Sequence, residues 1–389
     1  MKLILTLLVR DEGDIVDANI AYHLNRGVDF VVATDNNSVD GTLEILEEYR
    51  RMGYLHLIRE PGEDYAQSAW VTRMARLAAD EHGADWIIHG DADEFWWPHR
   101  GTLKDIFASI PERFGVLRAH RFDFIPRPEE EGFFADRMTV RVGLPDKTQV
   151  AHRPDPSVVV GQGNHRLDET LLESAPTLYA VDVLHFPLRS YAQFEEKIAR
   201  VGPDTGVKHW RSAYDAHARG DLRANWTSLL LDDATVDGLI ERGEQAPVDL
   251  FVGRAAKRPH GVPARDYRLR DYLRALRSEP ATTRSPTGFA LDVADPDPPV
   301  PDPEITLRLE IAARELLEQS KPFATRIKAQ ARELKELGRE NARLREELER
   351  VERRARASTA ARLNRPRWLS FSDRSRSRGE DAPPGASEQ

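Results

Sequence analysis

The chain has 389 residues, of which 56 are Lys or Arg and 65 are Asp or Glu, so its formal net charge at pH 7 is −9. Hydrophobic residues make up 40% and charged residues 31%, which excludes a wholly disordered chain and allows about two domains with a sizeable core. There is no cysteine, so disulfides, thiolate metal sites and cysteine nucleophiles are excluded, and any metal must bind carboxylates or imidazoles.

The apolar start of the chain, residues 1–9, is followed at once by Arg10, Asp11 and Glu12. Because it has neither a basic n-region nor a small-residue cleavage site, we interpret it as a first strand and not as a signal peptide. No stretch approaches the roughly 20 apolar residues that a spanning helix needs. We therefore expect a cytoplasmic protein, with at most a peripheral contact at the inner face of the membrane.

Short apolar runs alternate with amphipathic stretches along the first 90 residues. The pattern predicts strands at 3–9, 30–33, 54–58 and 86–89, and helices at 15–24, 43–49 and 66–79. Such alternation is typical of βαβ units, so we expect an α/β fold with a Rossmann-like, mostly parallel sheet flanked by helices. Further along, we expect strands at 115–119, 137–142 and 158–160, a helix at 191–201, and helical patterns up to about residue 276.

Prolines crowd residues 280–303, which predicts a semi-extended linker because proline suits neither a helix interior nor a central strand. Beyond it, a heptad repeat predicts a C-terminal coiled coil that joins two copies of the chain into a parallel homodimer. A lone solvated helix is the alternative. The two seams of the heptad consist of Ile327, Leu334, Asn341 and Leu348, and of Leu337, Leu344 and Val351.

Charge is divided unevenly, since acidic residues outnumber basic ones up to residue 320 and basic ones prevail over residues 321–378. The Arg-, Ser- and Pro-rich end of the chain is typical of disorder. Its arginines lead into Trp368 and Phe371, a mixture that suits an anionic membrane surface. A solubilising tail is the alternative, and although nucleic acid would attract the same charges, we do not expect it as the partner.

Acidic and polar side chains follow three of the predicted strands. Asp91 and Asp93 follow the fourth strand, Asp35 and Asn36 follow the second, and the segment 10–12 follows the first. In an open parallel sheet, ligands bind outside the carboxyl ends of the strands. Two carboxylates spaced by one residue can share one hard cation such as Mg²⁺ or Mn²⁺. A solvated strand-to-helix turn is the alternative interpretation of the acidic pair.

Several motifs give the chain a family resemblance over roughly residues 1–200. In order, they are Leu8-Val9-Arg10-Asp11-Glu12, Tyr22-His23, Asp35-Asn36-Asn37-Ser38 and Asp91-Ala92-Asp93-Glu94-Phe95. Their order and spacing resemble the family 2 and family 92 type glycosyltransferases of the GT-A fold. The resemblance implies a UDP- or GDP-sugar donor, a Mn²⁺ or Mg²⁺ ion on Asp91 and Asp93, and base and ribose contacts from Arg10, Glu12 and Asp35. Many family 2 members have two consecutive Asp where this chain has Asp35-Asn36, so the base contact falls on Asp35 or on the Asn36 amide.

The resemblance extends to residues farther along the chain, and each also has a structural interpretation. His185 is the candidate third metal ligand or a packed histidine, and His165 contacts donor or acceptor or shapes a glycine turn. Arg189 contacts diphosphate oxygens or lies on a helix surface. An inverting transfer also needs a carboxylate base, for which Asp168 and Glu169 are the candidates, with exposed loop acids as the alternative.

These inferences together predict a metal-dependent, inverting hexosyltransferase that acts on a glycan or glycolipid acceptor. Its GT-A domain would span residues 1–205, followed by a packed helical extension at 206–279, the linker at 280–303, the helix and coiled coil at 304–356, and the basic tail at 357–389. Two other classes remain. A sugar-phosphate nucleotidyltransferase would need a Gly-rich basic loop after the first strand, which residues 10–14 do not provide. A non-catalytic assembly protein would work through the coiled coil.

Overall fold

The computed structural model describes residues 1–62, 66–129, 131–145, 147–175, 180–201, 208–246, 261–291 and 293, and three isolated helical positions at 340, 343 and 350. The chain divides into two compact units, 1–314 and 315–389, and the fold given below is that of the first. Apart from those three positions, the expected coiled coil and basic tail lie outside the described residues, so both stay predictions.

The centre of the first unit is an eight-stranded sheet with the order β3-β2-β1-β4-β8-β6-β11-β5. The first four strands in this order are parallel, as the sequence predicts: β3 (Leu55–Arg59), β2 (Phe30–Asp35), β1 (Leu3–Val9) and β4 (Trp86–Asp91). The other half comprises β8 (Lys147–His152), β6 (Val116–Asp123), β11 (Val181–His185) and β5 (Glu94–Pro98). Strand β6 runs parallel to β11, whereas β8 and β5 are antiparallel to their neighbours, so the sheet is mostly parallel.

Two small two-stranded sheets lie outside the main one. They pair β9 (Val159–Val160) with β10 (Leu167–Glu169), and β7 (Val140–Arg141) with β12 (Ala264–Arg265). The sequence predicted one strand over residues 137–142, where the chain instead forms the short helix α5 (Phe134–Arg137) and then β7. The buried Phe134 side chain stacks on Phe95 and meets Phe186 edge to face in the core, and this packing favours the helical turn.

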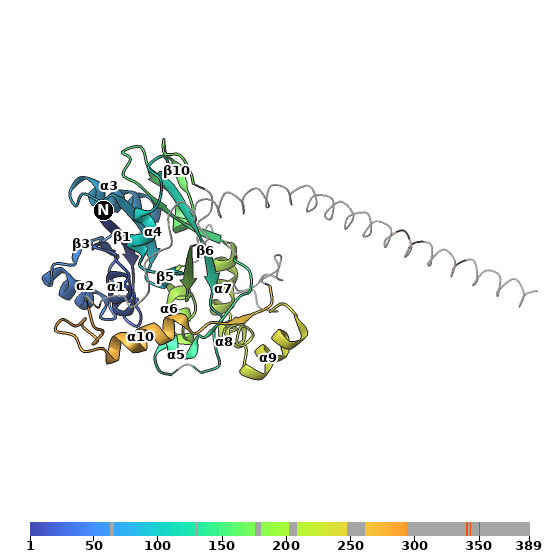
Figure 1. Ribbon diagram of the computed structural model, residues 1–389. Helices are drawn as coiled ribbons and strands as arrows, with labels where there is room; N and C mark the ends of the chain where they lie inside the picture. Colours follow the sequence, from blue (N-terminus) through green and yellow to red (C-terminus); the bar gives the residue numbers. More distant parts are fainter. Residues whose placement is uncertain are drawn as a thin grey trace, which may run out of the picture. The chain divides into compact units, whose positions relative to one another are not determined.

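Helices cover both faces of the parallel half of the sheet (Figure 1). The alternation along β1 sends Leu3, Leu5 and Leu7 into one apolar cluster, and Ile4 and Leu8 into another. Helices α1 (Val16–Asn25), α2 (Thr42–Arg51), α4 (Leu103–Ala108) and α10 (Arg268–Ser278) contribute to the first cluster, and α3 (Gln67–Asp80) covers the second. Both faces of the sheet are therefore buried, and the expected α/β class is confirmed.

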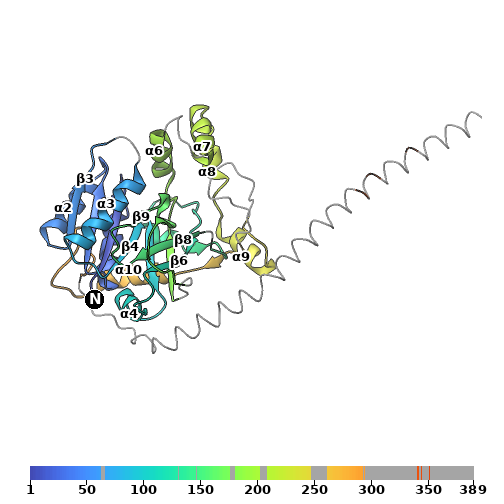
Figure 2. The ribbon, with the colours of Figure 1, turned by 90° about the horizontal axis from the view of Figure 1, so that it is seen from above.

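A separate helical group lies beside the sheet and has its own apolar cluster (Figure 2). It consists of α6 (Tyr191–Val201), α7 (Lys208–Ala218), α8 (Leu222–Thr227) and α9 (Asp233–Arg242). Trp226, 1% exposed, stacks on Phe194 and joins α8 to α6. No described helix combines the length and the apolar character that crossing a bilayer requires.

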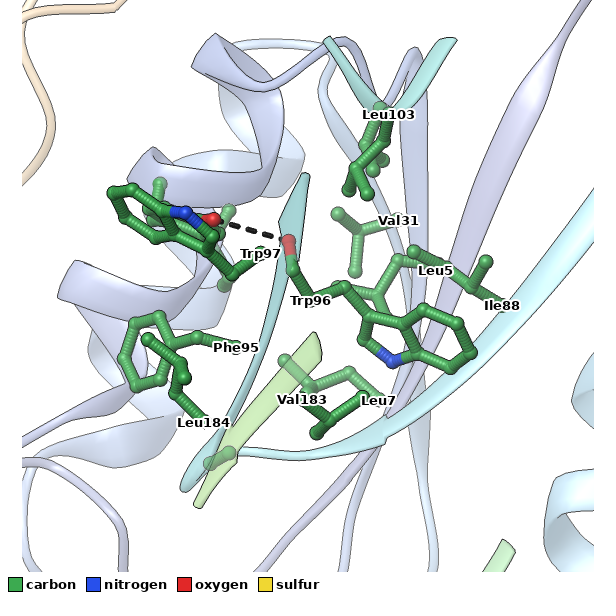
Figure 3. Close-up of a cluster of buried hydrophobic side chains, with 14 of the residues drawn as sticks. Leu5, Leu7, Val31, Ile88, Phe95, Trp96, Trp97, Leu103, Val183 and Leu184 are labelled. Atoms are coloured by element: carbon green, nitrogen blue, oxygen red, sulfur yellow. Dashed lines mark hydrogen bonds between the residues drawn. The ribbon is translucent and has the colours of Figure 1, made fainter. Parts of the chain in front are cut away.

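Strand β5 starts two residues after β4 and fixes the geometry between the two halves of the sheet. Figure 3 shows Trp96 pointing among Leu5, Ile88 and Val183, whereas Phe95 and Trp97 point to the other side of the strand. The Trp96 carbonyl accepts a hydrogen bond from the hydroxyl of Tyr22 on α1 at 3.0 Å. A strand that is buried on both sides holds the turn at residues 92–93 in one position.

Residues 280–291 and 293, part of the expected linker, pack on the core. Phe289 and Leu291 are 1% and 3% exposed and belong to the cluster beneath α1. Asp17 of α1 accepts hydrogen bonds from the Ser285 hydroxyl at 2.7 Å and from the backbone N–H of Thr287 at 3.0 Å. The apolar run at residues 289–291 makes this packing favourable, whereas the prolines predicted an extended chain. The other boundaries of the predicted division stay predictions.

Candidate functional site

Three strand ends with acidic side chains meet at one edge of the sheet. Asp35 at the end of β2 lies in register with Val9 of β1, and Asp91 at the end of β4 lies in register with Leu8. Neighbouring strands are about 4.8 Å apart, so the ends of β2 and β4, with β1 between them, are separated by roughly 10 Å. The predicted meeting of these carboxylates at the carboxyl edge is therefore found.

Asp93 and His185 lie against each other at this edge. Nε2 of His185 is 3.5 Å from Oδ1 of Asp93, and Nδ1 of His185 is 2.7 Å from Oδ1 of Asp123 at the end of β6. Burial and the Arg121 charge would lower the pKa of His185, but the two carboxylates outweigh them and raise it to about 9. Burial likewise opposes the low pKa of Asp93, which the His185 charge holds below its ordinary range. The imidazole is thus clamped between two carboxylates.

Asp91 has a different environment from Asp93. Its Oδ1 accepts hydrogen bonds from the side-chain amides of Gln67 at 3.3 Å and Asn164 at 3.2 Å. Burial, with the negative charges of Glu94 and Asp93, raises the pKa of Asp91 to about 8. The negative charges of this cluster repel one another and disfavour ionisation of Asp91 near neutral pH. A bound cation would offset this repulsion.

Arg189 lies inside the protein and not on a helix surface, and it connects the end of β1 to the cluster. Its Nε and Nη2 donate to the two carboxylate oxygens of Asp14 at 2.7 Å, and Nη2 also donates to Glu12. Its Nη1 lies 3.9 Å from Oδ2 of Asp93. Burial raises the pKa of Glu12 to about 7, although the Arg189 charge opposes the shift. The Arg189 guanidinium is therefore hydrogen-bonded to two carboxylates, Asp14 and Glu12, and lies close to a third, Asp93.

Asp35 and Asn36 differ in the hydrogen bonds that their side chains form. The Asn36 amide donates to the backbone carbonyls of Glu60 and Gly62 at 3.1 and 2.7 Å, and its oxygen accepts from Arg10 at 3.2 Å. From the residues that the structure describes, Oδ2 of Asp35 accepts only a long hydrogen bond, from the Ser38 backbone N–H at 3.4 Å. Asn36 thus ties β2 to the loop after β3, and Asp35 retains acceptor capacity.

The other predicted residues are not part of this cluster. Nδ1 of His165 lies 2.8 Å from the amide oxygen of Gln149, and burial with the Lys147 charge lowers the pKa of His165 to about 3, so the imidazole is neutral. Asp168 and Glu169 are exposed on β10, where Asp168 pairs with Arg166 at 2.6 Å.

Sequence reasoning missed a buried polar layer beneath the cluster. Arg121 of β6 contacts Glu94 at 3.3 Å and Asp123 at 3.2 Å, and Gln149 of β8 also donates to Glu94. Asn164, 1% exposed with a φ of 58°, belongs to the turn that touches Asp91. Arg121 and Asp123 follow Leu117 and Ala119 at a spacing of two residues, so they fall on the buried face of β6, and polar residues in this phase were a signal that could have been used.

Buried oxygens without a hydrogen-bond partner mark the edge. Within the part of the chain that the structure describes, they include Oδ1 of Asp35, Oδ1 of Asp93 and Oδ1 of Asn164. Over the same residues, no three His, Asp or Glu side chains are arranged to hold a metal ion. The donor set nevertheless fits a cation that displaces the Nε2 proton of His185, because Oδ1 of Asp93 accepts no hydrogen bond from these residues and the Asp123 contact turns Nε2 toward that oxygen.

Comparisons with known proteins give partial structural likenesses. No family model and no curated protein sequence matches the chain. TarS residues 1–349 of S. aureus, in complex with UDP-GlcNAc, aligns with a TM-score of 0.32 and 13% identity over 62% of this chain and 80% of that chain. A mannosyltransferase from Pyrobaculum calidifontis, in complex with GDP-Man and Mn²⁺, aligns with a TM-score of 0.25 and 15% identity over 31% of this chain.

A glucosyl-3-phosphoglycerate synthase from Mycobacterium tuberculosis, with Mn²⁺ and UDP, aligns with a TM-score of 0.23 and 15% identity over 31% of this chain. The matched part spans 35% of the mannosyltransferase chain and 44% of the synthase chain. TM-scores this low carry no conclusion about activity.

Proposed function

We propose that this chain is a GT-A-type glycosyltransferase, which moves a sugar from a nucleoside-diphosphate-sugar to a hydroxyl acceptor. The observation that carries the proposal is the pair of buried carboxylate oxygens, Oδ1 of Asp35 and Oδ1 of Asp93, which accept no hydrogen bond from any described residue. Among the same residues, Oδ1 of Asp93 has only the 3.5 Å charge contact with Nε2 of His185. Leaving such an oxygen unsatisfied costs about 1–3 kcal/mol or more, so these atoms are suited to a ligand.

The nucleoside would bind at the end of β2. Because the carbonyls of Glu60 and Gly62 occupy the Asn36 amide, the contact to base or ribose falls on Asp35, which can accept from an N–H or hydroxyl group of either. The contacts of Asn36 therefore favour Asp35 as the residue that would contact the base, at the place where many family 2 members have two consecutive Asp.

A divalent cation, Mn²⁺ or Mg²⁺, would be held by Asp91, Asp93 and His185. Carboxylate oxygens suit either ion, and an imidazole whose other nitrogen contacts a carboxylate is a common metal ligand. When bound, the cation would supply positive charge to the departing diphosphate. Asp123 orients His185 for this role, and Arg189 contributes to the site by holding Glu12, Asp14 and Asp93 in place.

The transfer forms a bond from the acceptor oxygen to the anomeric carbon, breaks the bond from that carbon to the diphosphate, and moves the hydroxyl proton to a base. We retain inversion, a hexose as the transferred sugar, and Asp168 or Glu169 as the base, as parts of the proposal. Both acids are exposed on β10 and would have to meet an acceptor there. A glycan or glycolipid acceptor, dimerisation through residues 304–356 and a membrane contact of the tail also remain proposals.

Thermal unfolding of the full chain with Mn²⁺ and single nucleotides tests the proposal. UDP or GDP should raise the Tm, and a ligand at 100 times its Kd stabilises by about 2.7 kcal/mol. The double variant D91N/D93N should lose the Mn²⁺-dependent part of that rise and the hydrolysis of UDP- or GDP-sugars. The matched control is D80N, which changes an exposed Asp at the end of α3 and should behave as the parent protein does.

The alternative classes give other outcomes. A response to triphosphates with a sugar phosphate, and none to UDP or GDP, would support a nucleotidyltransferase and overturn the proposal. A Tm that no nucleotide changes would support a non-catalytic assembly protein and overturn the proposal. Unchanged hydrolysis in D91N/D93N would show that these carboxylates are not the site.

A further inference from the structure

A groove of about 570 Å³ lies between α3 and β9, outside the carboxylate cluster. Figure 2 shows the two elements side by side. They are joined by the Ser68 hydroxyl, which donates to the Val160 carbonyl at 2.6 Å, and by the Val160 N–H, which donates to Thr72 at 2.9 Å. The residues that line the groove include Ser68, Ala69, Arg73, Arg76, Val159 and Gln162. A volume of this size is in the range of small-molecule sites.

The groove is positively charged. Arg73 and Arg76 lie one turn apart on the same face of α3, both are exposed, and none of the described residues that line the groove is acidic. Arg73 forms an ion pair with Glu60 at 2.9 Å, whereas Arg76 has no hydrogen bond or ion pair with any residue of the described ranges.

The start of α3 adds to this charge. No described side chain caps the helix at Ala66, and its first turn contains no acidic residue. The start of a helix carries a partial positive charge that falls off within the first turn. It makes the Ala66 end of the groove favourable to negative charge, and the two arginines attract an anion at the other end.

The groove and the carboxylate cluster share a wall. Gln67, next to the groove residue Ser68, donates to Asp91 and accepts from the backbone N–H of Gly163 at 3.0 Å. Asn164 also donates to Asp91 and belongs to the same turn as the groove residue Gln162. The groove and the candidate site therefore adjoin each other at the start of α3, where Gln67 and Asn164 border both.

We propose that this groove binds the acceptor, and that the acceptor carries an anionic group, phosphate or carboxylate, which Arg73 and Arg76 recognise. This inference rests on the proposed function. The two arginines are six and nine residues beyond Gln67, which at 1.5 Å per residue places them about 9 and 14 Å farther along the helix axis. The acceptor is thus a hydroxyl compound whose anion lies about that far from the hydroxyl that reacts.

The absence of cysteine from the chain allows a direct test by single-site labelling. Ala69 is exposed in the groove, so A69C introduces one thiol there, and Q162C is the second position if A69C fails to fold. A negatively charged methanethiosulfonate should label this thiol several-fold faster than a positively charged one, because the arginine charges attract the anion. Glycerol 1-phosphate or glycerate should slow the labelling, and glycerol should not.

Controls separate this inference from the proposed function. Adding R73Q/R76Q to A69C should abolish both the charge preference and the protection, whereas adding D91N/D93N should leave both intact. The exposed control S228C on α8 should show neither effect. If only glycerol 1-phosphate slows the labelling, the anionic group of the acceptor is a phosphate. If only glycerate slows it, that group is a carboxylate.

The inference is overturned if the preference and protection at A69C persist in R73Q/R76Q, or if neither is found at either groove position. If both effects follow the arginines while no nucleotide changes the Tm, the anion site stands and the proposed glycosyltransferase function fails. Loss of the protection in D91N/D93N would mean that the anion binds at the carboxylate cluster, which also overturns the inference.

Discussion

His185 contacts Asp123 through Nδ1 at a distance of 2.7 Å, and the opposite ring nitrogen is thereby turned toward the end of β4. The two residues end the neighbouring parallel strands β11 and β6 and lie in register with each other. Both are buried. Asp123 is therefore a positioning residue, because its contact fixes the orientation of the imidazole that would bind the metal.

Replacing Asp123 by Asn should weaken metal binding more than nucleotide binding. Loss of a carboxylate behind a ligating histidine typically costs 10- to 100-fold in metal affinity. We expect D123N to require about 10 to 100 times more Mn²⁺ for the Tm rise with UDP or GDP, while the rise without metal is unchanged. The measurement is a Mn²⁺ titration of the Tm at a fixed nucleotide concentration.

Asp182 provides the matched control, since it lies on β11 and contacts His99 at 3.0 Å in the same way. D182N should lower stability without changing the Mn²⁺ midpoint. An equal midpoint for D123N and the parent protein would show that Asp123 does not position His185 for a metal.

Arg189 is predicted to contribute to stability through its three acidic partners. Its side chain is fully buried, and Arg189→Met would remove the cation that contacts Glu12, while Asp93 would keep its contact with His185. Removing one partner of a buried ion pair costs about 3–5 kcal/mol. Urea unfolding should therefore show R189M less stable by about that amount, whereas D14N, whose side chain is 49% exposed, should cost about 1 kcal/mol or less. Weaker nucleotide binding by R189M at unchanged stability would instead favour a direct diphosphate contact.

The sequence predicted the parallel half of the sheet because its signals are local. In β1 to β4, continuous apolar runs alternate with helical periods, and both signals arise within a few residues. Strands β5 and β8 were missed. Residues 147–152 include only two apolar residues, Val150 and Ala151. Strand β5 has only three apolar aromatic residues between Glu94 and Pro98, and a proline favours a loop or an edge strand over a central strand.

Some residues of the candidate site could be predicted from the local sequence, and others could not. Asp35, Asp91 and Asp93 could be predicted because each follows a strand, and the meeting of parallel strand ends is a property of the fold. The burial of Arg189 could not, because nothing in its local pattern distinguishes a guanidinium at a helix surface from one that three carboxylates enclose. Long-range ion pairs of this kind depend on tertiary packing.

Phe289 tests whether the segment after α10 belongs to the core. It is 1% exposed and lies 6.1 Å, centroid to centroid, from the ring of Phe133. Phe289→Ala should lower the free energy of unfolding by about 3–5 kcal/mol, as expected for truncation of a buried aromatic side chain. Leu171→Ala, at a position that is 88% exposed, should change it by about 0.5 kcal/mol or less. Equal urea midpoints for the two variants would mean that the segment does not pack on the core.

His23 is a buried histidine whose two nitrogens are both occupied in the neutral form. Nε2 accepts from the Trp96 backbone N–H at 3.2 Å, and Nδ1 lies 2.8 Å from the Asn19 carbonyl. Burial lowers the pKa of His23 to about 4, whereas an unfolded chain would have a value near 6.5. A second proton would remove the acceptor that the Trp96 N–H needs.

Protonation of His23 should therefore lower the free energy of unfolding as the pH falls. Because the folded-state pKa is the lower one, the contribution is fully present above about pH 6.5 and is lost as the pH falls toward 4. Between pH 7 and pH 5 the free energy of unfolding should drop by about 2 kcal/mol on this account. Urea unfolding of His23→Gln at both pH values should show a drop that is smaller by that amount, whatever its absolute stability. His217→Gln, in which a partly exposed histidine on α7 is replaced, should retain the full drop. A parent-like drop in H23Q would mean that His23 does not titrate in this range.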